Sequence, residues 1–144
     1  MKILIAMSLT IGAALAADQK IKLQDMPPAV QQAVKEQSKG ATVRGYSKEV
    51  EDGTTSYEAE LTVNGRARDI SFGADGKVLA VEETVTLDSI PAPARAAIQK
   101  VAGTGKVNKV ESVAEKGVTN YEAAITKNGK KSEVKVDANG KTVK

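Results

Sequence analysis

Residues 53–65 read Gly-Thr-Thr-Ser-Tyr-Glu-Ala-Glu-Leu-Thr-Val-Asn-Gly, and residues 117–129 read Gly-Val-Thr-Asn-Tyr-Glu-Ala-Ala-Ile-Thr-Lys-Asn-Gly. The two stretches belong to a longer duplication, in which the 58 residues 23–80 align without a gap with residues 87–144 and 16 positions are identical. Each copy must fold as the same kind of unit, so the duplication predicts a tandem repeat before any local pattern is considered.

Apolar and polar residues alternate within the first of these stretches. Tyr57, Ala59 and Leu61 fall on one face of an extended segment, and Glu58 and Glu60 fall on the other. This alternation is typical of an antiparallel sheet that packs one face on a core and exposes the other to water.

Turn signals divide each copy into short extended segments. The pairs are Asp52-Gly53, Asn64-Gly65 and Asp75-Gly76 in the first copy, matched by Lys116-Gly117, Asn128-Gly129 and Asn139-Gly140 in the second. Asn-Gly and Asp-Gly favour the positive φ angles of two-residue hairpins. Four antiparallel segments are therefore predicted in each copy, and in the first they cover 42–51, 54–63, 66–72 and 77–83. A break in the alternation predicts a bulge near Arg44 to Gly45.

A helix is predicted before the strands of each copy. Apolar residues recur at helical spacing after Pro27 and again after Pro91, and Asp25 and Ser89 are expected to cap the two helices. The predicted fold class is α+β, a tandem repeat of a helix plus a four-stranded antiparallel meander sheet. The sequence leaves open whether the two sheets join.

The first residues have the form of a secretory signal. Lys2 precedes an apolar run that ends in the small-residue pattern Ala14-Leu15-Ala16. Polar residues follow at once, so the run is too short to cross a bilayer and no stable membrane anchor is expected. We expect a signal peptide at 1–16, cleavage near Ala16, and a periplasmic or secreted protein with repeats at 17–86 and 87–144.

Composition excludes several classes of function. The chain has no Cys and no His, which removes disulfides, thiolate chemistry, Ser-His-Asp catalysis and His-ligated zinc. With three Tyr, one Phe and no Trp it lacks stacking platforms, so nucleic acid is not an expected partner. Residues 17–86 carry a formal charge of −3 and residues 87–144 carry +5. Either drift between the copies or an acidic partner of the second half explains this difference.

The motif that both copies share resembles the PepSY-like family of exported bacterial proteins, whose members are often described as beta-lactamase-inhibitor-like. It runs from Leu23 to Pro27, through Ala33-Val34 and Gly53 to Ala59, to Ala74 to Lys77, and recurs 64 residues on. The resemblance implies helix-plus-sheet modules and a noncatalytic binding or inhibitory role in the bacterial envelope. The shared positions are turn glycines and core residues, so they transfer a fold and no active residues.

From these patterns we expect an exported, monomeric, noncatalytic binding module that recognises another envelope protein. No catalytic residue, cofactor or metal site is predicted. The candidate partner-binding residues are the polar side chains predicted to point outward from the second and third strands: Glu58, Glu60, Asp69, Glu122, Glu133 and Lys135.

Alternative functions remain open from the sequence. Small inner residues such as Ala59 and Ala123 would leave room for a carrier of a small apolar ligand between helix and sheet. A weak hydrolase would use a carboxylate pair such as Glu58 and Glu60. The segments around Asp75 and residues 137–140 could be calcium loops, but turns explain them better, because neither ends in a bidentate Glu. Residues 127–131 form either an anion-binding tip or a hairpin end protected by lysines.

Overall fold

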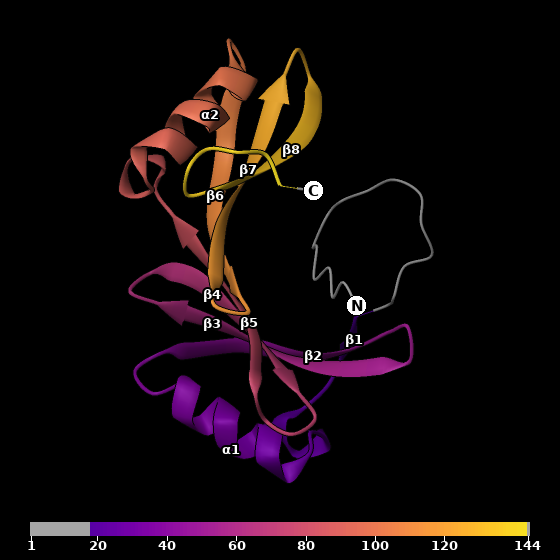
Figure 1. Ribbon diagram of the computed structural model, residues 1–144. Coiled ribbons are helices and arrows are strands. Elements are labelled where there is room, and N and C mark those ends of the chain that lie inside the picture. The colour runs from indigo at the N-terminus through magenta and orange to yellow at the C-terminus, as the bar shows by residue number, and fades with distance from the viewer. Residues whose placement is uncertain (1–17, 144) are drawn as a thin grey trace.

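The computed structural model describes residues 18–143, which form one antiparallel sheet and two α-helices (Figure 1). The eight strands of the sheet lie side by side in chain order. They are β1 (Gln19–Lys20), β2 (Thr42–Glu51), β3 (Thr54–Val63), β4 (Arg66–Gly73), β5 (Val78–Val85), β6 (Lys106–Glu115), β7 (Val118–Lys127) and β8 (Lys130–Asp137). The α+β class and the antiparallel pairing predicted from the sequence are confirmed.

Four of the six dipeptides form two-residue hairpin turns as predicted, whereas at Asp75-Gly76 and Asn139-Gly140 only the glycine has a positive φ. Asp52, Asn64, Lys116 and Asn128 all adopt φ angles between 48° and 51°, and each is followed by a glycine with a positive φ. Two consecutive residues of this conformation build the tight turn that matches the twist of the flanking strands. The predicted bulge is also present, as a shift of register between Val43 and Gly45, and it recurs in the second copy between Val107 and Lys109.

The helices α1 (Pro28–Gln37) and α2 (Ala92–Ala102) begin after prolines, as predicted, but their caps differ from the prediction. Pro27 and Pro91 occupy the N-cap positions, and neither helix has a side-chain cap. Asp25 instead accepts a hydrogen bond from the amide of Lys22 at 2.9 Å within the 3-10 turn η1 (Leu23–Asp25). Ser89 donates to the carbonyl of Thr86 at 2.8 Å within the corresponding turn η2 (Leu87–Ser89). The expected caps are too far upstream, because the chain makes a separate turn before each helix.

One hydrophobic cluster lies between α1 and the first half of the sheet. Val30 and Val34 of the helix are buried against the inward faces of β3 and β4. The fully buried side chains on those strands are Leu61, Ile70 and Phe72. Burial of each such side chain contributes about 1.5–3 kcal/mol, so this cluster holds the helix on the sheet.

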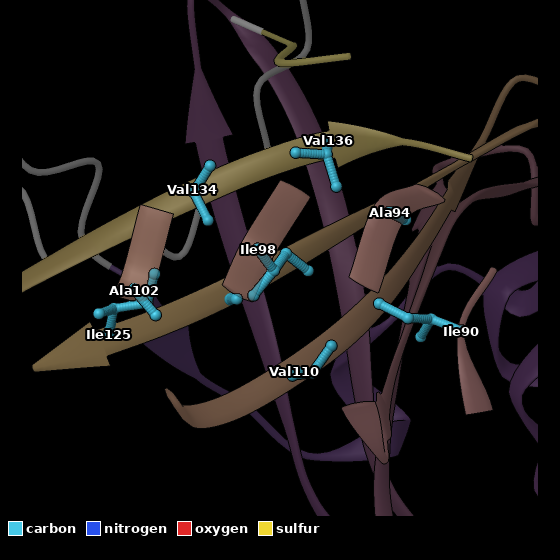
Figure 2. Close-up of a cluster of buried hydrophobic side chains, with 9 residues drawn as sticks. Ile90, Ala94, Ile98, Ala102, Val110, Ile125, Val134 and Val136 are labelled. Atoms are coloured by element: carbon cyan, nitrogen blue, oxygen red, sulfur yellow. The ribbon is translucent and has the colours of Figure 1, made fainter. Parts of the chain in front are cut away.

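An equivalent cluster lies under α2 (Figure 2). Ala94, Ile98 and Ala102 of the helix are directed toward the strands, where they pack against residues of β6, β7 and β8. The strand residues are Val110, Ile125, Val134 and Val136. Both helices therefore cover the same face of the sheet, and Figure 1 shows them on the outer side of its bend.

The two halves join into one sheet through β5 and β6. Residues 80–85 of β5 pair with residues 110–115 of β6 in an uninterrupted antiparallel register, from Ala80 opposite Glu115 to Val85 opposite Val110. This pairing settles the question that the sequence leaves open. It also leaves the opposite face of the sheet free of helices over both halves, and we call this face the open face.

The second copy differs from the prediction in its last segment. The first copy has a helix followed by four strands, whereas only β6, β7 and β8 follow α2. Beyond β8 the structure has an isolated bridge between Val136 and Thr142 in place of a fourth strand. In the first copy β5 is held by β4 on one edge and β6 on the other, while the segment at Thr142 has a neighbour on one edge only.

The expected signal peptide at 1–16 lies outside the described residues. Within residues 18–143, neither helix has the length and apolar character needed to cross a bilayer.

Candidate functional site

The open face contains a hollow of about 720 Å³ that extends over both halves of the sheet. Its lining is dominated by acidic side chains. From the first half these are Asp18, Glu58, Glu60, Asp69 and Glu82, and from the second half Glu111, Glu122 and Glu133. The basic side chains that line it are Arg44, Lys109 and Lys131. Fully ionised, these groups give the hollow a formal charge of −5, although the whole chain carries +3.

The register of the strands places like charges directly opposite one another. Glu60 of β3 lies opposite Asp69 of β4, and Asp69 lies opposite Glu82 of β5. We call these three residues the carboxylate row. On the second half of the sheet, Glu111 of β6 lies opposite Glu122 of β7. Like charges at directly opposed positions destabilise a sheet, so the fold alone does not favour this arrangement.

Cations on the same face neutralise part of this charge. Arg44, the bulge residue of β2, forms ion pairs with Asp69 and Glu60, the latter with 3.6 Å between Nη1 and Oε2. Lys135 of β8 binds Glu122 with 2.7 Å between Nζ and Oε1. The bulge matters because an extra residue re-aims the side chains of a strand, and here it brings a guanidinium over the carboxylate row.

Two carboxyls at the centre of the hollow have strongly raised pKa values. Burial raises the pKa of Glu58 to about 8, with further contributions from the neighbouring charges of Asp69 and Asp18. Burial likewise raises the pKa of Glu82 to about 7, with repulsion from Glu111 and Glu122 added. Removal of water from a carboxylate and the approach of like charges both disfavour its ionised form. The hollow therefore holds more negative charge than its own cations compensate.

The pKa of Asp69 is also raised, although Arg44 is bound to it. Burial is the largest cause and outweighs the attraction of the Arg44 guanidinium, while Glu60 and Glu111 raise the pKa further. A single arginine thus cannot neutralise the negative charge of the whole carboxylate row.

The structure places all six partner-binding residues predicted from the sequence on the open face. Glu58, Glu60, Asp69, Glu122 and Glu133 line the hollow, and Lys135 joins them through its ion pair with Glu122. The prediction that they bind a partner stays a prediction.

Two acidic residues of the site, Glu82 and Glu111, were not among the partner-binding residues predicted from the sequence. Glu82 and Glu111 lie where β5 meets β6, and their only signal was the alternation of the strands that carry them. The open face is also less exposed than predicted, because Ser71, Ala80 and Val113 are each about 95% buried on its floor. They become buried because the two halves join beside them.

Two other candidate sites form ordinary turns. The Asp75 carboxylate accepts the amide of Lys77 at 3.1 Å, and the Asp137 carboxylate accepts the amides of Asn139 and Lys141 at 2.9 Å. These oxygens serve the backbone of their own turns. Within residues 18–143, no group of three or more acidic side chains is arranged to hold a metal ion.

The chain thus combines an α+β architecture with one helix-covered face and one open, charged face. Residues 93–143 match the family model described as the peptidase propeptide and YPEB domain, PepSY. The resemblance to the PepSY-like family is thereby confirmed for this part of the second copy. No curated protein shows significant similarity to the sequence.

Solved structures from Bacteroides species share the fold. A Bacteroides eggerthii protein described as periplasmic aligns with a TM-score of 0.69 at 22% identity, over 83% of this chain and 86% of that one. A BLIP-like protein from Bacteroides fragilis aligns with a TM-score of 0.64 at 20% identity, over 83% and 84%. A DUF2874 family protein from Bacteroides ovatus aligns with a TM-score of 0.66 at 21% identity, over 83% and 86%. At these identities the likeness shows the fold alone.

Proposed function

We propose that this protein is an exported, noncatalytic module that binds another protein of the bacterial envelope through its open face. The observation that carries the proposal is the hollow of about 720 Å³, which is lined by side chains from both halves of one continuous sheet. A large concave surface with convergent polar groups is the usual form of a binding site.

Export is supported by the sequence and by the structural relatives. Residues 1–16 have the pattern of a cleaved signal peptide, and the Bacteroides eggerthii relative is described as periplasmic. A periplasmic or secreted location would place the open face among envelope proteins.

A binding role fits the chemistry of the face better than catalysis does. The raised pKa values of Glu58 and Glu82 would suit a general acid. A general acid also needs a second catalytic group with a different role beside it. The neighbours of Glu58 and Glu82 are further carboxylates on the same open face and, beside Glu82, Lys109, with no His or Cys in the chain. The apolar-carrier alternative is not favoured, because Ala59 and Ala123 are both buried within packed clusters.

The test is capture of a partner from the envelope fraction of the producing bacterium, by crosslinking and mass spectrometry. The wild-type chain is compared with Glu58→Lys/Glu60→Lys, which reverses charge in the hollow. The matched control is Glu36→Lys/Glu51→Lys, which reverses two exposed carboxylates on α1 and at the end of β2. The proposal expects a partner that the control retains and the hollow variant loses. A partner that both variants retain equally would place binding elsewhere.

A further inference from the structure

The duplication shows that the fold does not require the carboxylate row. Glu60 of the first copy corresponds to Ala124 of the second, on the same face of the equivalent strand. Ala124 lies between Lys109 of β6 and Glu133 of β8, so no carboxylate stands opposite Glu133 at this position. The same backbone therefore forms without the like-charge contacts that the first copy contains. Residues that break a local rule without need from the fold mark functional sites.

The acidic groups are spread over the face rather than gathered at one point. Glu58 and Glu60 lie on β3, Glu82 on β5, and Glu111 on β6. Neighbouring strands are about 4.8 Å apart, so these groups cover a strip of about 15 Å across the sheet. A single metal ion needs converging oxygens, and within residues 18–143 no such group is present. The strip suits an occupant with several positive charges along its length.

The cations of the face leave two central carboxylates without a partner. Arg44 pairs with Asp69 and Glu60, Lys109 with Glu111, and Lys135 with Glu122. In the part of the chain that the structure describes, Glu58 and Glu82 take part in no ion pair. A bound cation would therefore form its ion pairs with these two carboxylates.

The floor beneath these carboxylates is formed by small or apolar buried residues. Ser71, Ala80 and Val113 are each about 95% buried, and Ala80 lies directly opposite Ser71. A floor of small residues permits close approach of another backbone. The methylene stems of Lys or Arg side chains pack on such a surface while their charged ends reach the carboxylates.

We propose that the open face binds a positively charged polypeptide segment, whose Lys or Arg side chains lie between Glu58, Glu82 and Glu111. The inference rests on the proposed function and names the chemistry of the partner. Charge complementarity carries it, since the fully ionised hollow has a formal charge of −5 on a chain of charge +3.

Binding of such a segment is coupled to proton release. Glu58 is surrounded by Asp69, Asp18, Glu82 and Glu60, and Glu82 by Glu111, Glu122, Asp69 and, as the one cation, Lys109. An incoming cation stabilises the ionised form of both groups. The affinity therefore rises as the pH increases from about 6 to about 8, and protons leave the complex on binding.

The probe is a synthetic peptide of about ten alternating Lys and Ala residues, long enough at ~3.3 Å per residue to cross the hollow. Calorimetry at pH 7 in two buffers of different ionisation enthalpy measures affinity and released protons together. Glu60→Gln/Glu82→Gln should weaken the peptide at least about tenfold, whereas the control Glu36→Gln/Glu51→Gln should bind like wild type. Gln retains the size of Glu and removes like charge, so the test variant keeps its fold.

Several outcomes would overturn the inference. They are equal binding by Glu60→Gln/Glu82→Gln, equal binding of a Glu-Ala peptide, binding without proton release, or equal affinity for spermidine or Ca²⁺ alone. The two proposals fail separately. A captured envelope partner that requires Glu58 and Glu60, together with no binding of the cationic peptide, would retain the binding function and reject the cationic partner. A cationic peptide that binds through Glu82, together with no captured envelope protein, would retain the cationic binding site and reject the envelope partner.

Discussion

Asp69 of β4 lies directly opposite Glu82 of β5, so that two carboxylates face each other across neighbouring strands. Glu60 continues the same row on β3. Directly opposed like charges cost a sheet a few tenths of a kcal/mol to about 1 kcal/mol each. The protein carries this cost on the face that its helices leave free, and the cost changes with pH.

Stability should fall as the pH rises from about 5 to about 8. Folding raises the pKa of Glu58 to about 8 and that of Glu82 to about 7, from an ordinary value of 4.5. Below pH 4.5 Glu58 and Glu82 are protonated in both the folded and the unfolded state, so they do not change the free energy of unfolding. Above it the unfolded chain ionises first, and the folded state loses stability until its own groups ionise. Taken in full, the two pKa changes would correspond to about 8 kcal/mol. Solvent screens both groups because each is partly exposed, so we expect a smaller loss, on the order of 2 kcal/mol, measured by urea unfolding across this range.

The variant Glu58→Gln/Glu82→Gln tests the origin of this pH dependence. It should be more stable than wild type at pH 8 and nearly equal to it at pH 4.5, because burial disfavours the ionised carboxylates of Glu58 and Glu82 and their neighbours repel them, whereas the protonated groups are affected by neither. The pKa values of Asp69 and Glu49 are also raised, so the variant should retain a smaller decrease of stability with pH. Glu36→Gln serves as the control, since Glu51 contributes to the raised pKa of Glu49. If the stability of Glu58→Gln/Glu82→Gln falls with pH as steeply as that of the wild type, other groups cause the pH dependence.

Arg44→Gln should destabilise the protein by about 1–2 kcal/mol at pH 8. The substitution removes the ion pairs with Asp69 and Glu60 and leaves both carboxylates opposed. At pH 5 the loss should be smaller, since Glu82, with a pKa of about 7, is then protonated and no longer repels Asp69. Arg66→Gln, at the exposed start of β4, should change stability by less than about 0.5 kcal/mol. Equal losses for Arg44→Gln at both pH values would contradict the role of the guanidinium.

The continuous sheet predicts that both halves unfold together. Phe72 is fully buried in the first cluster, so Phe72→Ala should cost about 3–5 kcal/mol. Since β5 pairs with β6, the free energy of opening of the slowest-exchanging amides in β7 should fall by the same amount, although β7 belongs to the other half. Amide exchange followed by NMR measures it. Full protection of β7 in this variant would mean that the halves unfold independently.

Local sequence signals predicted the hairpins and the strand faces. Asn64-Gly65 and Asn128-Gly129 each permit a two-residue turn, and such a turn fixes the register of the strands on either side. Once the register is fixed, the alternation around Tyr57 decides that Glu58 and Glu60 share a face. The six predicted binding residues could therefore be placed on the outward face of their own repeat from the sequence alone.

The join between the halves could not be predicted in the same way. Between Val85 of β5 and Lys106 of β6 the chain forms a complete helix, so no turn fixes the register of this pair. Their pairing depends on how α2 packs on its own strands, which is a tertiary effect. The meeting of Glu82 with Glu111 and Glu122, and the burial of Val113, follow from that pairing. The bulge was predictable, but the direction of the Arg44 side chain was not.

The turn at Gly140 should be the most sensitive of the glycine turns in the second half. Gly140 has a φ of +82°, and a Cβ built there would lie 2.5 Å from the carbonyl oxygen of Pro93 at the start of α2. Gly117 provides the matched control, with a φ of +77° and no atom within 4 Å of its Cβ position. Gly117→Ala should cost about 1–2 kcal/mol from backbone strain alone. Gly140→Ala should cost about 2 kcal/mol more, because the turn must also move away from the helix. Urea unfolding of the two variants measures the difference, and equal losses would mean that the turn does not pack against α2.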